Sequence, residues 1–248
     1  MDASSERVRD DVRVRRASGY VALAAAVAIG AGGCGAASPD SPPSGVDELT
    51  IPTPSPDPAD FVRRIDNPWL AFAPGRTWTY SVRGASTGEL VITVEDTTYD
   101  IAGVATTPVS RTEPTGDQVV DYYAQDRRGN VWWFGREGVW LAGEDGAEAG
   151  LAMPATPRYG DGWRAAYDDD VVDVRATVET RDQVVSTPAG TFRQVLGIDV
   201  TSPLEPGTAR RVFYARGVGL VEELSTDGPV YLAELESPPR VLPARSEP

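Results

Sequence analysis

The feature that most constrains the fold is an alternation of apolar and polar residues with a period of two, which recurs between residues 61 and 236. In the segment TWTYSV, Trp78, Tyr80 and Val82 share one face of an extended chain, and threonine and serine residues share the other. Two further segments behave in the same way: VDVRATVE, with Val172, Val174, Ala176 and Val178 in phase, and TFRQVLGIDV, with Phe192, Leu196, Ile198 and Val200 in phase and Gln194 as the exception. Because successive side chains of a strand point to opposite faces of a sheet, this pattern predicts half-buried antiparallel strands.

Short clusters rich in glycine, proline, asparagine and aspartate separate these segments, as expected for hairpin turns. They lie at 84–88, 126–130, 135–138, 188–190, 206–207, 216–217 and 227–229. No window has the period of a long amphipathic helix, and residues 60–65 allow at most one short helical turn. We therefore predict an all-β fold of about ten strands, a single antiparallel meander domain over residues 61–236 that forms a curved sheet or a partly closed barrel.

One predicted strand departs from the alternation. In NVWWFG, Trp132 and Phe134 face one side and Trp133 the other, and Trp140 follows shortly afterwards. A strand that is apolar on both faces must be covered on both. The cover is either a loop or short helix, which makes both faces structural, or a ligand in a hydrophobic groove. We mark these four aromatic residues as candidate ligand-binding residues, and residues 150–164, which lack a strand pattern, as a candidate cover.

The N-terminal segment has the organisation of a secretory signal. Arginines precede an uncharged run, at positions 7, 9, 13, 15 and 16. The run, Gly19–Gly33, is about 15 residues long and therefore shorter than the roughly 20 residues that cross a bilayer as a helix. Small residues then lead to Cys34, an order that resembles the lipobox of bacterial lipoproteins, although Ala31 stands where that family usually has leucine. The alternatives are an ordinary signal peptide and an uncleaved anchor.

The lipobox resemblance implies that residues 1–33 are removed and that Cys34 becomes a lipidated N-terminus, with acyl chains of the palmitate class. The protein is then expected at the cell membrane, lipid-anchored on its extracytoplasmic face. Residues 34–60 contain seven prolines and no aromatic residue, which predicts a disordered tether behind the lipidated cysteine. Residues 237–248 are expected to form a disordered tail.

The composition excludes several chemistries. The chain contains neither histidine nor lysine and has a single cysteine, which excludes nucleophile–histidine catalysis, histidine-ligated metals, Schiff bases and an internal disulfide. The formal net charge of -14 argues against a nucleic-acid partner. The sequence contains no glycine-rich phosphate loop, and we predict no cofactor. Carboxylate chemistry remains open, such as calcium binding at Asp168, Asp169 and Asp170 or a glycosidase pair. An acidic run before a strand is usually a solvated turn, so we predict neither an enzyme nor a metal site.

Five strings spread over residues 67–223 carry a resemblance: NPWLAFAPGRTWTY, DYYAQDRRGNVWWFG, GLAMPATPRYGDGWR, STPAGTFRQVL and FYARGVGLVEE. They resemble a family of uncharacterised secreted or lipid-anchored bacterial β-domain proteins, lipoproteins of the actinobacterial type. The resemblance implies a single β-domain outside the cytoplasm. The family carries no assigned activity, so no functional residue transfers from it. The string DRRGNVWWFG alone also looks like one blade of a sensor β-propeller, but propellers need several copies and this motif occurs once.

Two function classes remain. The first is a carrier or sensor that binds an apolar small molecule in a β-cup, by analogy of fold with lipoprotein carriers of the bacterial envelope. The second is a protein-interaction module on a tether, whose partner is another envelope protein. A closed apolar cavity beneath the tryptophans favours the first, and a flat, exposed aromatic patch favours the second.

Overall fold

The computed structural model describes residues 57–70 and 72–241, all of which belong to one compact unit. The signal segment 1–33, Cys34 and most of the expected tether lie outside the described residues. A single turn of 3-10 helix, Pro58–Asp60, precedes the first strand. The side chain of Asp57 accepts a hydrogen bond from the backbone N–H of Ala59 and so caps this turn.

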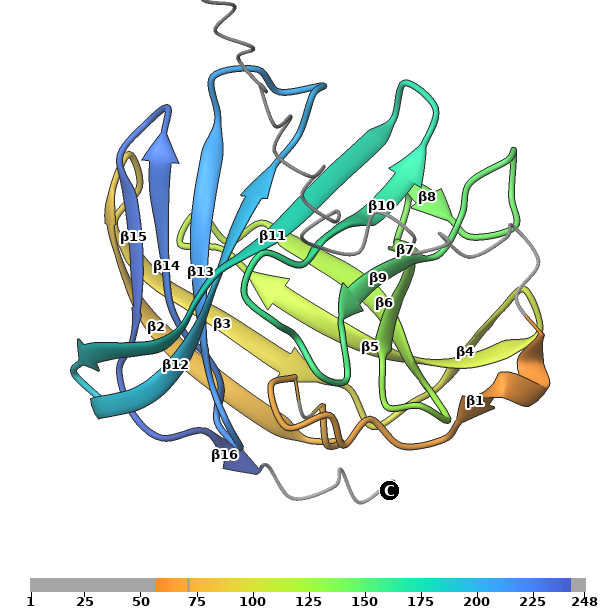
Figure 1. The fold of residues 1–248 in the computed structure, drawn as a ribbon, viewed down its shortest axis with the longest axis horizontal. Helices are drawn as coiled ribbons and strands as arrows, with labels where there is room; N and C mark the ends of the chain where they lie inside the picture. Colours follow the sequence, from red (N-terminus) through yellow and green to blue (C-terminus); the bar gives the residue numbers. More distant parts are fainter. Residues whose placement is uncertain (1–56, 71, 242–248) are drawn as a thin grey trace, which may run out of the picture. The chain divides into compact units, whose positions relative to one another are not determined.

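Sixteen strands make up the described fold (Figure 1). They are β1 (Phe61–Val62), β2 (Arg76–Gly84), β3 (Gly88–Val94), β4 (Tyr99–Ile101), β5 (Val104–Thr112), β6 (Gln118–Asp126), β7 (Val131–Arg136), β8 (Trp140–Leu141), β9 (Gly150–Met153), β10 (Gly162–Asp168), β11 (Val172–Thr187), β12 (Gly190–Thr201), β13 (Ala209–Ala215), β14 (Gly219–Asp227), β15 (Tyr231–Leu235) and β16 (Arg240–Val241).

All strand pairs are antiparallel, and the sheet runs in the order β10-β11-β12-β13-β14-β15-β2-β3-β5-β6-β7-β8. The late strand β15 pairs with the early strand β2, which joins two meanders into one sheet. The sheet then curves back on itself, because β9 pairs with β7 on one side and an isolated bridge joins Glu148 to Tyr167 of β10 on the other. These features confirm the expected all-β class and the antiparallel, nearly closed sheet.

Gly150 marks the point of closure between β9 and β10. A Cβ atom placed on Gly150 would lie 2.1 Å from the carbonyl oxygen of Ala165. No side chain fits at that distance, so the two strands approach this closely only because residue 150 is glycine.

The elements differ from the sequence-based expectation at several short strands. Residues 150–164 were expected to be irregular, yet Gly150–Met153 form β9 and β10 begins at Gly162. Arg240–Val241, within the expected tail, form β16 beside β2. Strands of two to four residues are too short to show an alternation, so only their pairing partners identify them.

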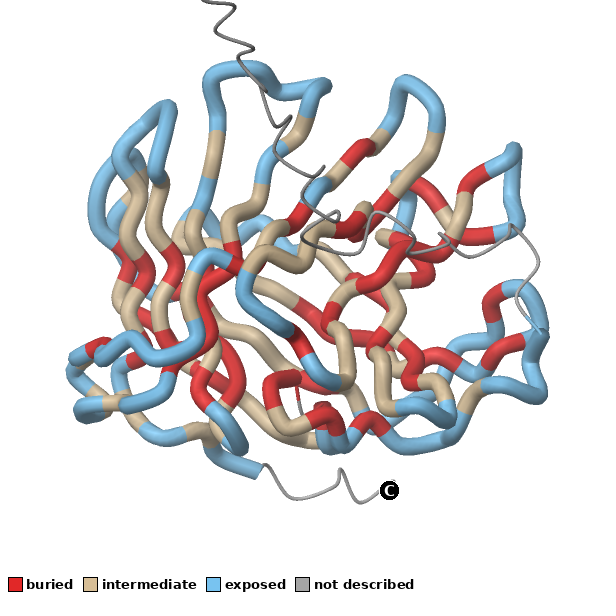
Figure 2. The backbone as a smooth tube through the Cα atoms, viewed as in Figure 1, coloured by how far each residue is buried: buried red, intermediate tan, exposed pale blue. Residues whose placement is uncertain are grey.

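The interior of the sheet holds the main hydrophobic core, and Trp78, Tyr80 and Val82 are buried in it as predicted. Figure 2 shows the buried residues mainly along the strands, away from the loop tips. The exception at Gln194 also has a structural cause. Gln194 has a φ of 53°, and the pairing between β11 and β12 shifts register next to it. This bulge resets the alternation, so that the neighbours Val195 and Leu196 are both fully buried.

A second, smaller core lies on the far side of β5, β6 and β7. Phe134 is its central side chain, and the ring of Phe61 from β1 meets it edge-on at 5.2 Å between centroids. Buried alanines of the loop between β8 and β9 complete this core, namely Ala142, Ala147 and Ala149. The strand NVWWFG is therefore covered on both faces, and most of the outer cover is structural.

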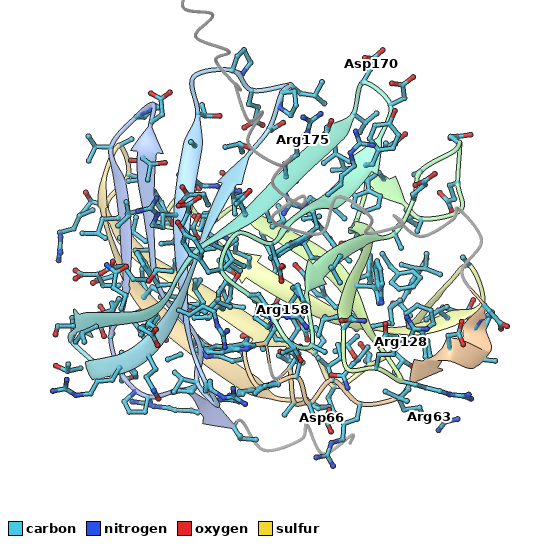
Figure 3. All side chains as sticks on the ribbon, viewed as in Figure 1. Arg63, Asp66, Arg128, Arg158, Asp170 and Arg175 are labelled. Carbon is cyan, nitrogen blue, oxygen red and sulfur yellow. The ribbon has the colours of Figure 1, made fainter. Side chains whose placement is uncertain are left out.

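The segment between β1 and β2 closes one end of the sheet. The backbone N–H groups of Asp66 and Asn67 both donate to Oε1 of Gln125, at 2.9 and 2.8 Å. The carbonyl of Pro68 accepts from Gly217 N–H at 2.7 Å, and Trp69 is buried in the main core. At the opposite end the hairpin loops project freely; Figure 3 labels Asp170 at that end and Asp66 at the closed end.

Candidate ligand-binding cup

The interior of the sheet contains two adjoining spaces. The inner chamber has a volume of about 240 Å³ and is lined in part by Leu70 and Phe72 from the closing segment. The vestibule, about 620 Å³, is lined by strand ends and hairpin loops at the open end. The residues that line both spaces define a neck between them: Arg111, Trp133, Arg136, Val174, Val200 and Arg210. We refer to the chamber, neck and vestibule together as the cup.

Apolar side chains form most of the chamber wall. Strands on all sides contribute them: Trp78, Ile92, Val109, Trp163, Ile198, Val212 and Leu220. Phe72 connects the closing segment to this wall, with its ring 6.1 Å from Trp78 and 5.1 Å from Tyr123, centroid to centroid. A concave apolar surface with few polar groups is the usual character of a small-molecule site.

Arg111 of β5 is the centre of the polar network at the neck. Its Nη1 donates to Oε2 of Glu223 at 3.1 Å, its Nε to Oε1 of Glu113 at 2.6 Å and its Nη2 to the hydroxyl of Tyr231 at 3.0 Å. Glu223 also accepts from Nη1 of Arg210 at 3.0 Å. One carboxylate of β14 therefore bridges guanidinium groups from β5 and β13.

Glu223 is ionised although its side chain is only 3% exposed. Burial alone would raise the pKa of this carboxyl, but the guanidinium groups of Arg111 and Arg210 outweigh burial and hold the pKa below its ordinary value. Burial alone would likewise lower the pKa of Arg111, and the charge of Glu223 beside it reverses that effect, so the pKa is raised. The neck network is therefore fully charged at neutral pH.

A second ion pair lies across the neck. Arg136 donates from Nε and Nη2 to the two carboxylate oxygens of Asp121, at 2.8 and 3.0 Å, which is the bidentate geometry that makes such pairs strong. Its guanidinium carbon also lies 5.4 Å from the ring centroid of Trp133, which is a cation–π contact. Trp133 in turn stacks on Tyr123 at 6.3 Å and meets Trp140 edge-on at 5.4 Å.

The loops around the vestibule carry exposed aliphatic side chains. Val139, Val171 and Leu204 line the vestibule and are 55%, 49% and 45% exposed, and Val230 is 72% exposed on a neighbouring loop. Figure 2 shows these hairpin ends as mainly exposed, in contrast to the buried middles of the strands. The apolar character of the chamber thus continues outward to the mouth of the cup.

The four aromatic residues marked from the sequence occupy three different environments. Trp133 lines the chamber and vestibule, and Trp140 lines the vestibule. Phe134 is fully buried in the second core and lines neither space. Trp132 contacts a separate hollow beside Arg128 and Arg158, and its Nε1 donates to Asp126 at 3.0 Å. A role in ligand binding stays a prediction; of the four residues, Trp133 and Trp140 line the cup.

Sequence reasoning missed the charged residues of the neck, although some carried a signal. Arg111 is two residues from Val109, Asp121 two from Tyr123, and Arg210 two from Val212, so each charge falls in the inward phase of its strand. Glu223 gave no such signal. A register shift in the pairing of β13 with β14 skips Val221, which changes the phase of the residues that follow.

Neither a metal-ligand cluster nor a membrane-spanning helix is found in the described part of the chain. Across residues 57–70 and 72–241, no group of three or more aspartate, glutamate, histidine or cysteine side chains is arranged to hold a metal ion. In the same ranges, none of the helical structure has the length and apolar character required to span a membrane.

The described fold is an antiparallel sheet nearly closed around a cup. No family model and no curated protein matches the chain. A crystal structure described as a "putative exported protein with YmcC-like fold" from Bacteroides fragilis is 15% identical, with a TM-score of 0.38, over 69% of this chain and 98% of that one. A "putative lipoprotein" from Parabacteroides distasonis is 13% identical, with a TM-score of 0.37, over the same shares. Likenesses this low establish neither fold nor function here.

Proposed function

We propose that the protein is an extracytoplasmic lipoprotein, anchored at the membrane through Cys34, that binds an apolar ligand in the cup. The observation that carries the binding proposal is the inner chamber, an apolar space of about 240 Å³ that opens through a neck into a wider vestibule. The signal-like segment before Cys34 supports the location. Under this proposal the protein carries or senses a ligand and performs no chemistry on it.

A purified mature protein tests ligand binding directly. We expect native mass spectrometry to detect a co-purified small apolar molecule, and a fluorescent lipid probe to bind the ligand-free protein. A substitution at the neck distinguishes binding in the cup from binding elsewhere on the surface. Val174→Phe should narrow the neck and weaken probe binding at least about tenfold, because it fills space that the ligand must cross.

The matched control is Val184→Phe, which places the same bulk on an exposed position of the same strand, β11. We expect this control to bind the probe like wild type. Equal probe binding by both variants and the wild type would show that the ligand does not occupy the cup.

The anchor is tested separately. Cys34→Ala should leave the protein unprocessed or release it from the membrane fraction, because the buried acyl chains, at about 0.8 kcal/mol per CH₂ group, supply the membrane affinity. A variant that is processed and fractionates like wild type would contradict lipidation at Cys34.

The second candidate function is a protein-interaction module. The exposed aliphatic side chains on the rim favour it, since such residues on neighbouring loops resemble the apolar centre of an interface. The two candidates differ in one result: a partner-binding module should be insensitive to Val174→Phe at the neck and sensitive to Leu204→Asp at the rim.

A further inference from the structure

The neck and the rim of the cup carry the polar groups nearest to the path into the chamber. The site is the cup itself, and this inference rests on the proposed function of binding an apolar molecule there. The polar groups on the path from the mouth to the chamber decide which amphiphile fits.

The three arginines of the neck are already neutralised. Arg111 is paired with Glu113 and Glu223, Arg210 with Glu223, and Arg136 with Asp121 in bidentate geometry. Together with Glu113, Glu223 and Asp121, the three arginines form a network of three positive and three negative groups. An anionic head group placed there would compete with these carboxylates for the guanidinium donors, and it would bring a further negative charge close to Glu223, whose side chain is only 3% exposed. The arginines thus do not form an open anion site.

The rim beyond the neck is acidic. Five hairpin loops contribute residues to the vestibule lining or flank it: 113–117, 137–139, 168–171, 202–208 and 227–230. Apart from Glu113, which is paired with Arg111, their sequences contain seven aspartate or glutamate residues and no arginine, in a chain with 23 arginines. Negative charge around a mouth with low-dielectric walls raises the local concentration of cations and lowers that of anions.

Two of these rim carboxylates line the vestibule and have no basic partner in the described structure, Glu205 and Asp227. Asp227 accepts only the backbone N–H of Gly228, at 2.9 Å, and Glu205 accepts from the hydroxyl of Thr208 at 3.4 Å. They differ in this respect from the carboxylates of the neck. Both are placed to meet the head of a molecule whose apolar part extends through the neck into the chamber.

We propose that the ligand is a cationic amphiphile, with its hydrocarbon part in the chamber and its positively charged head in the vestibule near Glu205 and Asp227. The negative charge of the rim disfavours an anionic head, such as a fatty carboxylate, and the paired arginines of the neck offer it no net positive charge. An uncharged head of the same size binds with intermediate affinity, because only the apolar part contributes.

Three chain-matched probes test the proposal: decyltrimethylammonium, decyl maltoside and decanoate, each kept below its micelle concentration and measured by calorimetry on the mature protein. We expect the affinities to fall in that order, with the cationic probe at least about tenfold tighter than decanoate at low salt. The ratio should shrink as salt is added, because the rim charges are solvent-exposed and screened. Decanoate binding as tightly as the cationic probe would overturn the proposal while leaving the cup intact.

Two variants make the result specific. The double variant Glu205→Gln, Asp227→Asn should weaken the cationic probe about fivefold and leave decyl maltoside unchanged. Asp182→Asn, an exposed acid on the β11–β12 hairpin and outside the vestibule lining, is the matched control and should change neither. Val174→Phe should weaken all three interactions at least about tenfold; a cationic probe that binds this variant as tightly as wild type adsorbs to the acidic surface, which would count against the proposal. If no probe binds the wild type, the proposed function itself fails.

Discussion

Nη1 of Arg111 in β5 lies 3.1 Å from Oε2 of Glu223 in β14, and this ion pair spans the interior of the sheet. In the order of the sheet the two strands are separated by β15, β2 and β3. The pair therefore connects two parts of the wall that are not neighbours in the sheet. It makes the neck a fixed, polar constriction above an apolar chamber.

Removal of the Glu223 carboxylate should destabilise the fold strongly. Glu223→Gln leaves Arg111 without its main counter-ion in a buried position, and breaking one side of a buried pair costs about 3 kcal/mol or more. Chemical denaturation of the variant and wild type measures the difference. The control is Glu222→Gln, because burial and the like negative charge of Glu234 raise the pKa of Glu222, and no arginine forms an ion pair with Glu222 in the described structure. An equal loss of stability in both variants would contradict the role of the network.

The same carboxylate predicts a loss of stability in acid. The pKa of Glu223 is lower in the folded protein than its ordinary value of 4.5. A group with a depressed folded pKa stabilises the protein above its unfolded pKa, and this contribution is lost as the pH falls through the folded pKa. The stability difference between wild type and Glu223→Gln should therefore narrow below about pH 4.5. Denaturation curves over this range measure the narrowing; a constant difference would contradict it.

Buried tyrosines predict a second loss of stability in alkali. Burial raises the pKa of Tyr214 to about 12 and that of Tyr80 well above 10.0. Because a raised folded pKa stabilises fully below the unfolded pKa, the contribution should disappear as the pH rises from about 10 through 12. Tyr80→Phe should flatten this dependence, at the expense of the hydrogen bond from the Tyr80 hydroxyl to the Leu220 carbonyl. Melting temperatures across the alkaline range, with ultraviolet titration of the tyrosines, provide the measurement.

The aromatic strand should respond differently at each of its positions. Phe134→Ala should lose about 3–5 kcal/mol, because it removes a fully buried ring from the second core. Trp133→Ala should cost less stability but weaken probe binding, since this ring lines both spaces of the cup. Trp132→Ala is the neighbouring control, and it should leave probe binding unchanged because its ring contacts a separate hollow. If Trp132→Ala and Trp133→Ala affect probe binding equally, Trp133 has no special part in the site.

Closure of the sheet should depend on the missing side chain at residue 150. Gly150→Ala would place a Cβ atom 2.1 Å from the Ala165 carbonyl oxygen, so β9 and β10 must move apart. We expect a cost of about 3 kcal/mol and faster amide hydrogen exchange in both strands. Gly162→Ala, also at the edge of β10, meets no atom closer than 3.6 Å and should be close to neutral.

A good part of this architecture was predictable. The alternation at Trp78, Tyr80 and Val82 placed a strand and its buried face correctly, and the glycine- and proline-rich clusters marked most of the long hairpins. The candidate site was predicted less well. Trp133 and Trp140 lie at the cup, but Trp132 and Phe134 do not, because one sequence pattern of consecutive aromatic residues serves three environments.

The sequence by itself indicated the long strands with a regular alternation, such as β2, and their apolar faces, because both depend on neighbours along the chain. It also determined the absence of histidine and lysine chemistry. Only the tertiary structure decided that β15 lies beside β2, that β9 returns to β7 and that Arg111 meets Glu223. Those contacts join residues far apart in the chain, and their energies depend on burial and pairing that exist only after the sheet has curved. The chamber and its charged neck arise at that level, which is why no segment of the sequence displays them.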